Sequence, residues 1–304
     1  MATLTVFTPL YNRINTLRRT YESMKNQTCK DFVWMIVDDG STDNPYDEIK
    51  KWIEETKDFE IRYIHKENGG MHTAHNTAYE NIDTEINVCV DSDDFMPDNA
   101  VELIVNCWNK NRHKGYAGII ALDCDSVHNK VIGKELPTDK ESTTLQGYYN
   151  SGGFGDKKLI YRTDIIKSTP EYPVFDNEKY FALAYKYHII DENYELKILN
   201  ECVCIVEYQF DGSSANMYRQ YVNNPKGFAF WRIQQMKNSV NVKQKLKACV
   251  HYVSSSFICK NKNFLKESPC KFFTLLALPV GWAFSIVVKR KAKSSFMKVE
   301  GLNK

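Results

Sequence analysis

The sequence predicts an α/β protein with a mostly parallel central sheet and helices on both faces. Short apolar runs and amphipathic stretches alternate four times in about 110 residues. This alternation is typical of parallel sheets with helical crossovers. Polar clusters follow three of the four apolar runs. Because ligands of such sheets bind beyond the carboxyl ends of the strands, we expect these clusters to form one site.

The first strand and helix are predicted within residues 4–24. Leu4 to Phe7 form an apolar run. Pro9 is expected to end this strand, because proline has no backbone N–H to donate to a ladder. Four apolar residues then recur at helical spacing, and they are Ile14, Leu17, Tyr21 and Met24.

Two more strand–helix units are predicted within residues 32–81. The strands cover 32–37 and 60–64. Pro45 favours the start of the first helix, whose buried face is expected to carry Tyr46, Ile49 and Ile53. The turn Asn68-Gly69-Gly70 precedes the second helix, over 72–81.

The fourth unit carries three carboxylates within four positions. An apolar run over 85–90 ends at Asp91, Asp93 and Asp94. In a strand, the period of two puts Asp91 and Asp93 on the same face. Clustered carboxylates repel each other unless a cation lies among them, and a divalent metal that holds a diphosphate is one such cation. The following helix, from Pro97, is expected to bury Val101, Ile104, Val105 and Trp108.

Beyond residue 115 the alternation weakens. Strands are predicted over 116–122, 130–134, 158–161 and 196–206, and helices over 177–187, 217–237 and 242–260. We therefore expect a domain over 1–215, divided near residue 115, and a separate helical region over 216–304.

The C-terminal region is strongly basic. From Lys237 onward, fourteen Lys and Arg residues stand against two acids, although the net charge of the whole chain is +2. An uncharged run over 272–288 precedes a basic segment, 289–293, and contains Pro279 and Gly281. This run is short for a membrane span, so we expect a helix in the interface of an anionic membrane. The alternative is a pair of buried helices docked on the domain.

The cysteine pattern predicts a cytosolic compartment. Nine cysteines are scattered without a C-x-x-C or metal-ligand spacing, which is typical of reduced thiols. Residues 1–8 run directly into a strand, so no signal peptide is expected. The predicted location is cytoplasmic, peripheral at the inner face of the cell membrane. No nucleic-acid partner is expected.

Four motifs, in order and spacing, resemble the GT-A-fold glycosyltransferases of family 2 of the bacterial surface-polysaccharide type. The motifs are Thr8-Pro9-Leu10-Tyr11-Asn12-Arg13, Val37-Asp38-Asp39-Gly40-Ser41-Thr42-Asp43, Asn68-Gly69-Gly70 with Ala74-His75-Asn76, and Asp91-Ser92-Asp93-Asp94. The resemblance implies an inverting hexosyltransferase that uses a nucleotide-sugar donor, usually a UDP-sugar, with Mn²⁺ or Mg²⁺. The acceptor would be a hydroxyl of a glycan or lipid-linked glycan. Residues 1–115 would bind the donor and 116–215 the acceptor.

The resemblance also implies roles for individual residues. Tyr11 would pack near the base, and Asp38 would accept a hydrogen bond from the uracil N–H. Asp93 would ligate the metal, with Asp94 in support. The full substrate-binding set is Thr8, Pro9, Tyr11, Arg13, Asp38, Asp39, Gly70, His75, Asn76, Asp91 and Ser92. Family members often carry a cation where this chain has Met71 or His75. Either a phosphate-directed cation is missing, or His75 replaces it.

An inverting transfer needs a base that removes the proton from the acceptor hydroxyl. In the family this carboxylate lies at the start of a helix, well after the metal motif. Glu178 is the first candidate and Asp176 the second. The alternative is that both acids only cap a helix starting at Asn177.

Two other classes of protein remain open. A sugar nucleotidyltransferase also uses an α/β sheet and acidic metal ligands. It needs a basic glycine-rich loop after the first strand, whereas the turn from Thr8 to Arg13 has no glycine. A non-catalytic nucleotide-sugar binding module would keep the donor site and lack the base. The segments 151–156 and 208–221, the second with Tyr218 and Arg219, resemble acceptor-side and donor-closing segments, although 151–156 is equally typical of a plain surface loop.

Overall fold

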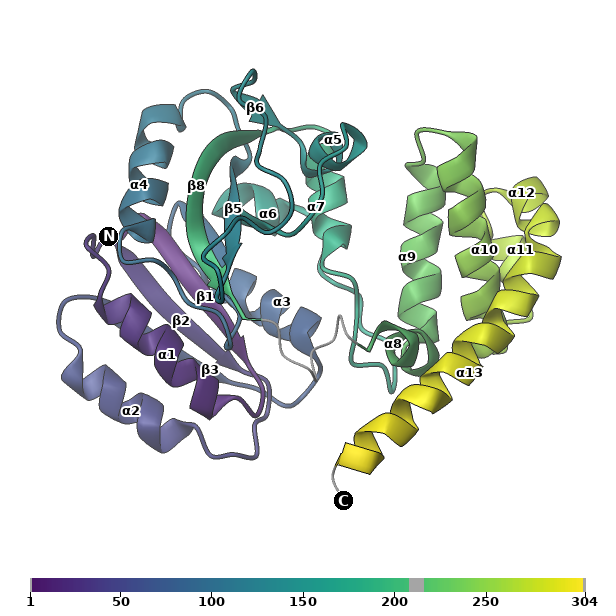
Figure 1. Ribbon diagram of the computed structural model, residues 1–304, viewed down its shortest axis with the longest axis horizontal. Helices are drawn as coiled ribbons and strands as arrows, with labels where there is room; N and C mark the ends of the chain where they lie inside the picture. Colours follow the sequence, from purple (N-terminus) through teal and green to yellow (C-terminus); the bar gives the residue numbers. More distant parts are fainter. Residues whose placement is uncertain (1, 208–215, 303–304) are drawn as a thin grey trace. The chain divides into compact units, whose positions relative to one another are not determined.

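The described part of the chain forms an eight-stranded sheet and a group of C-terminal helices (Figure 1). This computed structural model describes residues 2–207 and 216–302, with side chains described as far as residue 294. The strands are β1 (Leu4–Leu10), β2 (Phe32–Asp38), β3 (Glu60–His65), β4 (Ile86–Cys89), β5 (Gly118–Asp125), β6 (Ser142–Thr143), β7 (Lys157–Arg162) and β8 (Leu196–Val206). Their order in the sheet is β3-β2-β1-β4-β7-β5-β8-β6.

The helices belong partly to the sheet and partly to the C-terminal region. Those that accompany the sheet are α1 (Ile14–Lys25), α2 (Tyr46–Glu55), α3 (Met71–Asn81), α4 (Ala100–Asn111), α5 (Leu145–Asn150), α6 (Thr163–Ser168) and α7 (Ala184–Asp191). Those that follow it are α8 (Met217–Asn223), α9 (Pro225–Lys237), α10 (Val242–Ile258), α11 (Phe264–Glu267), α12 (Lys271–Leu276) and α13 (Leu278–Leu302).

The sheet has a parallel half and a mixed half. β1 pairs in parallel with β2 and β4, and β2 with β3, as predicted for the first four units. β7 then lies antiparallel between β4 and β5, and β8 is parallel to β5. The predicted fold class, a mostly parallel sheet with flanking helices and a helical C-terminal extension, is confirmed.

Helices cover both faces of the parallel half. α1, α2 and α4 share one buried cluster with alternate strand residues such as Val6 and Trp34. The intervening residues point to the other face, where Phe7 lies edge-on to His75 and Tyr79 of α3. The predicted inward residues of α1 and α4 are buried or partly buried against the core, which confirms those two faces.

β1 continues through Pro9, which the sequence analysis placed at its end. The Val90 N–H donates to the Phe7 carbonyl, so the backbone of Phe7 faces β4. Pro9 lies two residues further and faces the same side, but β4 has already ended at Cys89. The missing N–H of Pro9 therefore leaves no gap in the ladder, and the strand extends to Leu10.

Three other local predictions were wrong. On α2, Ile49 and Trp52 are buried while Tyr46 and Ile53 are exposed, because Trp52 stacks on Tyr21 with ring centroids 4.5 Å apart. Segment 130–134 forms an isolated bridge rather than a strand. The helix predicted over 217–237 divides at Pro225, which lacks the N–H that a continuous helix requires.

The helix predicted from Asn177 begins only at Ala184. Asn177 has a φ of 64°, in the left-handed region, and such a residue cannot continue a right-handed helix. Residues 176–183 form turns and irregular backbone instead. Asp176 and Glu178 therefore do not lie in the first turn of a helix.

The described chain divides into two compact units. The sheet unit comprises 2–171 and 186–207, and the helical unit comprises 172–185 and 216–302. Segment 172–185 thus packs with the C-terminal helices, whereas the predicted boundary at 215 places it with the sheet. Among the helices that the structure describes, none has both the length and the apolarity needed to cross a bilayer.

Candidate active site

Three loops meet where β1, β2 and β4 end, as the sequence predicts. The loop after β1 is bonded to the loop after β2, since the Asn12 N–H donates to Ser41 Oγ at 3.0 Å and the Thr42 N–H to Asn12 Oδ1 at 2.7 Å. Arg19 of α1 reaches the third loop, where its Nη2 donates to the Asp93 carbonyl at 2.7 Å. The structure therefore brings the predicted polar clusters to one edge of the sheet.

Asp38 is a buried carboxylate at the end of β2. Its Oδ1 accepts the Ser41 N–H at 2.9 Å, and its Oδ2 accepts the Tyr63 hydroxyl at 2.6 Å and lies 3.0 Å from His65 Nδ1. Burial raises the pKa of Asp38, but these hydrogen bonds outweigh burial and hold the pKa below its usual value. Asp38 is therefore an ionised acceptor at neutral pH, already engaged by protein donors.

Asp39 holds the glycine turn in place. Its carboxylate accepts the Gly69 N–H at 2.9 Å, the Gly70 N–H at 2.7 Å and Lys66 Nζ at 2.7 Å. Gly70, with a φ of 97°, then leads into α3. All these donors come from the segment after β3, so Asp39 anchors that segment. The sequence motif predicts a substrate contact for Asp39, whereas these hydrogen bonds depend on a segment about thirty residues further along the chain.

The first motif contains both core and surface residues. Thr8 and Pro9 are buried, and Thr8 Oγ1 accepts the Trp34 indole N–H at 3.1 Å. Tyr11 is 48% exposed, and Arg13 is partly exposed. Of the residues predicted for nucleoside binding in this motif, Tyr11 and Arg13 are therefore the accessible ones.

His75 is uncharged at neutral pH. It is fully buried, with Nδ1 3.2 Å from the Tyr79 hydroxyl and Nε2 3.6 Å from Cys89 Sγ. Burial lowers the pKa of His75 to about 3. His75 therefore does not replace the phosphate-directed cation, and the neighbouring Asn76 is only partly buried.

The acidic motif after β4 contains both solvent-accessible and buried residues. Asp91 and Asp93 are partly exposed, whereas Ser92 and Asp94 are buried. Asp94 Oδ1 accepts the Glu207 N–H at 3.1 Å, and the Asp94 carbonyl accepts Thr20 Oγ1 at 2.7 Å. Burial, with help from Asp91 and Asp93, raises the pKa of Asp94 to about 7. Asp94 is thus placed to support the loop, and Asp91 and Asp93 to meet a ligand.

The exposed pair fits a metal that arrives with phosphates. Among the described residues, no three His, Cys, Asp or Glu side chains form a group able to hold a metal ion. Mg²⁺ bound to a nucleotide usually takes only one or two carboxylates, and phosphate oxygens and water complete its shell. Two accessible carboxylates beside a buried third one suit that type of site, because their mutual repulsion favours a cation.

Lys158 of β7 lies beside the acidic motif, where no sequence pattern predicts a cation. Val88 of β4 pairs with Ile160, so Lys158 lies two residues further, beside the end of β4. Its Nζ is 3.5 Å from Asp123 Oδ1. Burial disfavours its charge, but Asp123, Asp94 and Asp91 raise the pKa of Lys158 well above its usual value. Lys158 is therefore a built-in cation beside the acidic motif.

The two base candidates lie in the helical unit. Glu178 is buried, and its two oxygens accept the N–H groups of Lys226 and Gly227, each at 2.8 Å. Burial raises the pKa of Glu178, and these two hydrogen bonds oppose the rise. Asp176 is exposed. Glu178 therefore caps the N-terminus of α9, which follows it by almost fifty residues, instead of a helix of its own segment.

The structure describes all of the predicted segment 151–156 and only part of the predicted segment 208–221. The glycine-rich segment 151–156 packs on residues 133–134, where the Lys134 N–H donates to the Phe154 carbonyl at 3.0 Å. It is therefore an ordered loop of the sheet unit. In the second segment, residues 208–215 lie outside the described residues, and Tyr218 and Arg219 lie on α8.

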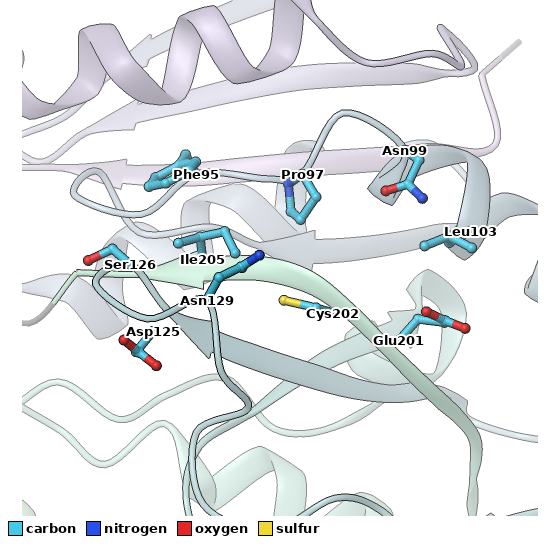
Figure 2. A pocket seen from close by; sticks show the side chains of 10 residues that line it. All are labelled: Phe95, Pro97, Asn99, Leu103, Asp125, Ser126, Asn129, Glu201, Cys202 and Ile205. Carbon is cyan, nitrogen blue, oxygen red and sulfur yellow. The ribbon is translucent and has the colours of Figure 1, made fainter.

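A pocket of about 510 Å³ lies beside the acidic motif in the sheet unit. Figure 2 shows it between the segment after Asp94, the end of β8 and the turn at Asp125. Phe95 and Ile205 form one wall, where their backbones pair. None of the predicted donor-binding residues lines this pocket, so donor contacts are not assigned to it.

Curated relatives match parts of the chain. It is 38% identical over 101 residues to the glycosyltransferase GlyA of Streptococcus pneumoniae, covering 33% of this chain and 14% of the relative. It is 33% identical over 156 residues to a chondroitin synthase of Pasteurella multocida, covering 51% of this chain and 14% of the relative. It is 34% identical over 180 residues to a teichoic acid poly(glycerol phosphate) polymerase of Staphylococcus epidermidis, covering 55% of this chain and 23% of the relative. The chain thus matches less than a quarter of these relatives' own length.

Solved structures of glycosyltransferases share the fold. S. aureus TarS 1–349 in complex with UDP-GlcNAc is similar with a TM-score of 0.60 and 14% identity, covering 97% of this chain and 92% of that one. The mannosyltransferase PcManGT of Pyrobaculum calidifontis, in complex with GDP-Man and Mn²⁺, has a TM-score of 0.53 and 16% identity, covering 98% and 79%. The family model of glycosyl transferase family 2 matches residues 5–169, more than half of the chain. The chain therefore belongs to glycosyl transferase family 2.

Proposed function

We propose that this protein transfers a sugar, with inversion, from a nucleotide-diphosphate sugar to a hydroxyl of a glycan. The observation that carries the proposal is the convergence of three motif loops and two accessible carboxylates at one sheet edge. A UDP-sugar is the first candidate donor. It is supported by Asp38, an ionised acceptor suited to a uracil N–H, and by the similarity of the fold to TarS with UDP-GlcNAc.

The donor would lie across the loops at this edge. Tyr11 would pack on the base, one oxygen of Asp38 would accept the N–H of the base, and Asp91 would face the ribose. Asp93, supported by Asp94, would hold Mn²⁺ or Mg²⁺, which would neutralise charge on the leaving diphosphate. Lys158 lies near Asp91 and Asp94 and would add positive charge beside the same group.

The base is proposed to come from segment 176–178. A base must direct a lone pair at the acceptor hydroxyl. Both oxygens of Glu178 already accept backbone N–H groups, whereas Asp176 is exposed. These contacts favour Asp176 as the base and Glu178 as its support, which reverses the order that the sequence favours.

The acceptor is proposed to be a lipid-linked glycan of a bacterial surface polysaccharide or teichoic acid, at the inner face of the membrane. The chondroitin synthase and teichoic acid polymerase among the relatives support this class, and so does the basic C-terminal region.

A screen of nucleotide sugars for metal-dependent UDP release tests the reaction. We expect UDP release with at least one UDP-sugar, and loss of release in Asp93→Asn. A parallel assay supplies UTP and a sugar 1-phosphate instead, and release of pyrophosphate from that mixture would identify a nucleotidyltransferase. Donor binding without release of either product would identify a binding module.

Two variants test the base. Asp176→Asn is expected to lower turnover about 100-fold or more, which is the usual contribution of a general base. Folded Glu178→Gln protein is expected to lose less turnover than Asp176→Asn. Donor affinity, measured separately, should stay unchanged in both variants. If both retained full turnover, neither acid would be the base.

A further inference from the structure

α13 packs on α10 and α8 and buries one row of its residues. The row consists of Gly281, Ser285, Val288 and Ala292, which repeat at helical spacing. A Cβ added at Gly281 would lie 2.6 Å from Val253 Cβ of α10, so the two helices approach closely there. This row is therefore the inner face of α13.

The opposite side of α12 and α13 exposes large apolar side chains. We call this surface the outer face, and its residues are Phe272 (68% exposed), Leu275, Leu276, Val280, Trp282 (52% exposed) and Val287. The two helices follow each other at the yellow end of the chain in Figure 1. An amphipathic helix on a soluble surface normally turns polar residues outward. Here several exposed residues are large and apolar, and exposed apolar surface of this kind marks interaction surfaces.

A basic cluster continues the outer face along α13. Lys289, Arg290, Lys291 and Lys293 are all exposed, and with Lys271 they are the charged residues of segment 268–294. This segment contains no Asp or Glu. A helix whose apolar side chains border a purely cationic stretch is complementary to an anionic bilayer, where apolar groups enter the acyl boundary and cations meet headgroup phosphates.

We propose that the outer face and the basic cluster form a docking surface for an anionic lipid bilayer, with α12 and α13 lying along its surface. The proposal deepens the proposed function, because it names the part of the chain that would hold the enzyme where a lipid-linked acceptor resides. The exposed aromatic side chains of Phe272 and Trp282 suit the boundary between headgroups and acyl chains.

Vesicle co-sedimentation of the full chain tests the proposal. We expect binding to phosphatidylcholine vesicles that contain about 30% phosphatidylglycerol, and much weaker binding to pure phosphatidylcholine. Binding should weaken at about 0.5 M NaCl, because salt screens the contribution of the cations.

Two sets of substitutions separate the apolar and the charged contributions. The triple variant Phe272→Ser, Val280→Ser, Trp282→Ser is expected to lose binding at least 10-fold. The triple variant Lys289→Gln, Arg290→Gln, Lys293→Gln is expected to lose about 100-fold on anionic vesicles. Lys291 is left unchanged because its Nζ donates to the Tyr218 hydroxyl at 3.2 Å.

Matched controls remove equal numbers of exposed residues elsewhere. The apolar control is Val127→Ser, Val240→Ser, Val242→Ser, and the charge control is Lys50→Gln, Lys51→Gln, Lys57→Gln, all at exposed positions. Both controls should bind vesicles as the unchanged chain does. Circular dichroism and thermal unfolding establish that every variant is folded.

The proposal is overturned if the unchanged chain ignores anionic vesicles, or if the test variants bind as well as their controls. Self-association that the apolar variant abolishes, without vesicle binding, would instead assign the outer face to a second copy of the chain. UDP release from the donor is measured without vesicles. Failure of docking is therefore distinguishable from failure of the proposed reaction.

Discussion

At the scale of single residues, acids that are adjacent in sequence have different structural roles. Asp38 and Asp39 are neighbours in sequence, yet Asp38 accepts from side chains of β3 and Asp39 from backbone N–H groups of the glycine turn. Asp91, Asp93 and Asp94 divide in the same way into two accessible carboxylates and a buried one. Residue type alone does not distinguish these structural roles, because the roles depend on partners from other parts of the chain.

Asp39→Asn should destabilise the sheet unit. The change weakens the hydrogen bonds from Gly69 and Gly70 and leaves Lys66 without its carboxylate partner. We expect the free energy of unfolding to fall by about 2 kcal/mol, the usual worth of hydrogen bonds to a charged group. Urea unfolding measures this change. Asp47→Asn, at an exposed position on α2, is the control and should have little effect. Equal stability of the two variants would contradict the anchoring role.

His75 should make the fold sensitive to mild acid. The pKa of His75 is about 3 in the folded chain and about 6.5 when unfolded, so between these values the unfolded state binds more protons. Stability is therefore lost as the pH falls below about 6.5. From about pH 7 to pH 5 the loss from His75 is about 2 kcal/mol.

The comparison of the parent chain with His75→Gln checks this prediction. Urea unfolding at both pH values should show a smaller loss of stability on acidification in the variant. His113→Gln, in the turn after α4, serves as the control for a histidine substitution in general. An unchanged pH dependence in His75→Gln would show that His75 is not the group responsible.

At the scale of elements, prediction succeeded where the signal is local. Apolar periodicity located the first four strands and helices because each needs only its own residues. Convergence of the three polar clusters followed from the shared edge of parallel strands. Lys158 was missed because an antiparallel strand, β7, inserts beside β4 after more than sixty intervening residues. The partner of Glu178 was missed because α9 follows it by almost fifty residues.

The close contact of α10 and α13 gives a test at the same scale. Gly281→Val should destabilise the helical unit by about 1–3 kcal/mol, because the new side chain would overlap Val253. Ala283→Val is the matched control, since Ala283 is exposed on the same helix. Thermal unfolding of the two variants compares them. Similar melting temperatures would mean that α13 does not pack on α10 as described.

At the scale of the whole molecule, the two units are interleaved in sequence. Among the described residues, 2–171 and 186–207 belong to the sheet unit, and 172–185 and 216–302 belong to the helical unit. The predicted division at residue 215 assigns only residues after 215 to the helical region. The short segment 172–185 has no distinct composition, so the sequence does not show that it belongs there. This segment contains both base candidates, Asp176 and Glu178.

A chain that ends at residue 207 should therefore be less soluble than the full chain. It keeps 172–185 but lacks α9, so Phe181 and Tyr185 lose the contacts of Phe230 and Trp231. We expect aggregation and dye binding to exposed apolar surface. Replacing Phe181 and Tyr185 by Ser in the shortened chain should restore solubility. A soluble, monomeric 1–207 chain without these substitutions would contradict the interleaving.

The late position of β7 has a consequence for synthesis of the chain. β4 is complete at Cys89, but its neighbour in the sheet emerges only with Lys157–Arg162. Until then β4 is an edge strand with open hydrogen-bonding groups, and such edges favour wrong pairing. The acidic motif also lacks Lys158 during this interval. A nascent chain longer than the whole parallel half is thus needed before the carboxylates meet their internal cation. We expect pulse-proteolysis of stalled nascent chains to show a protected β4 only after β7 has left the ribosome.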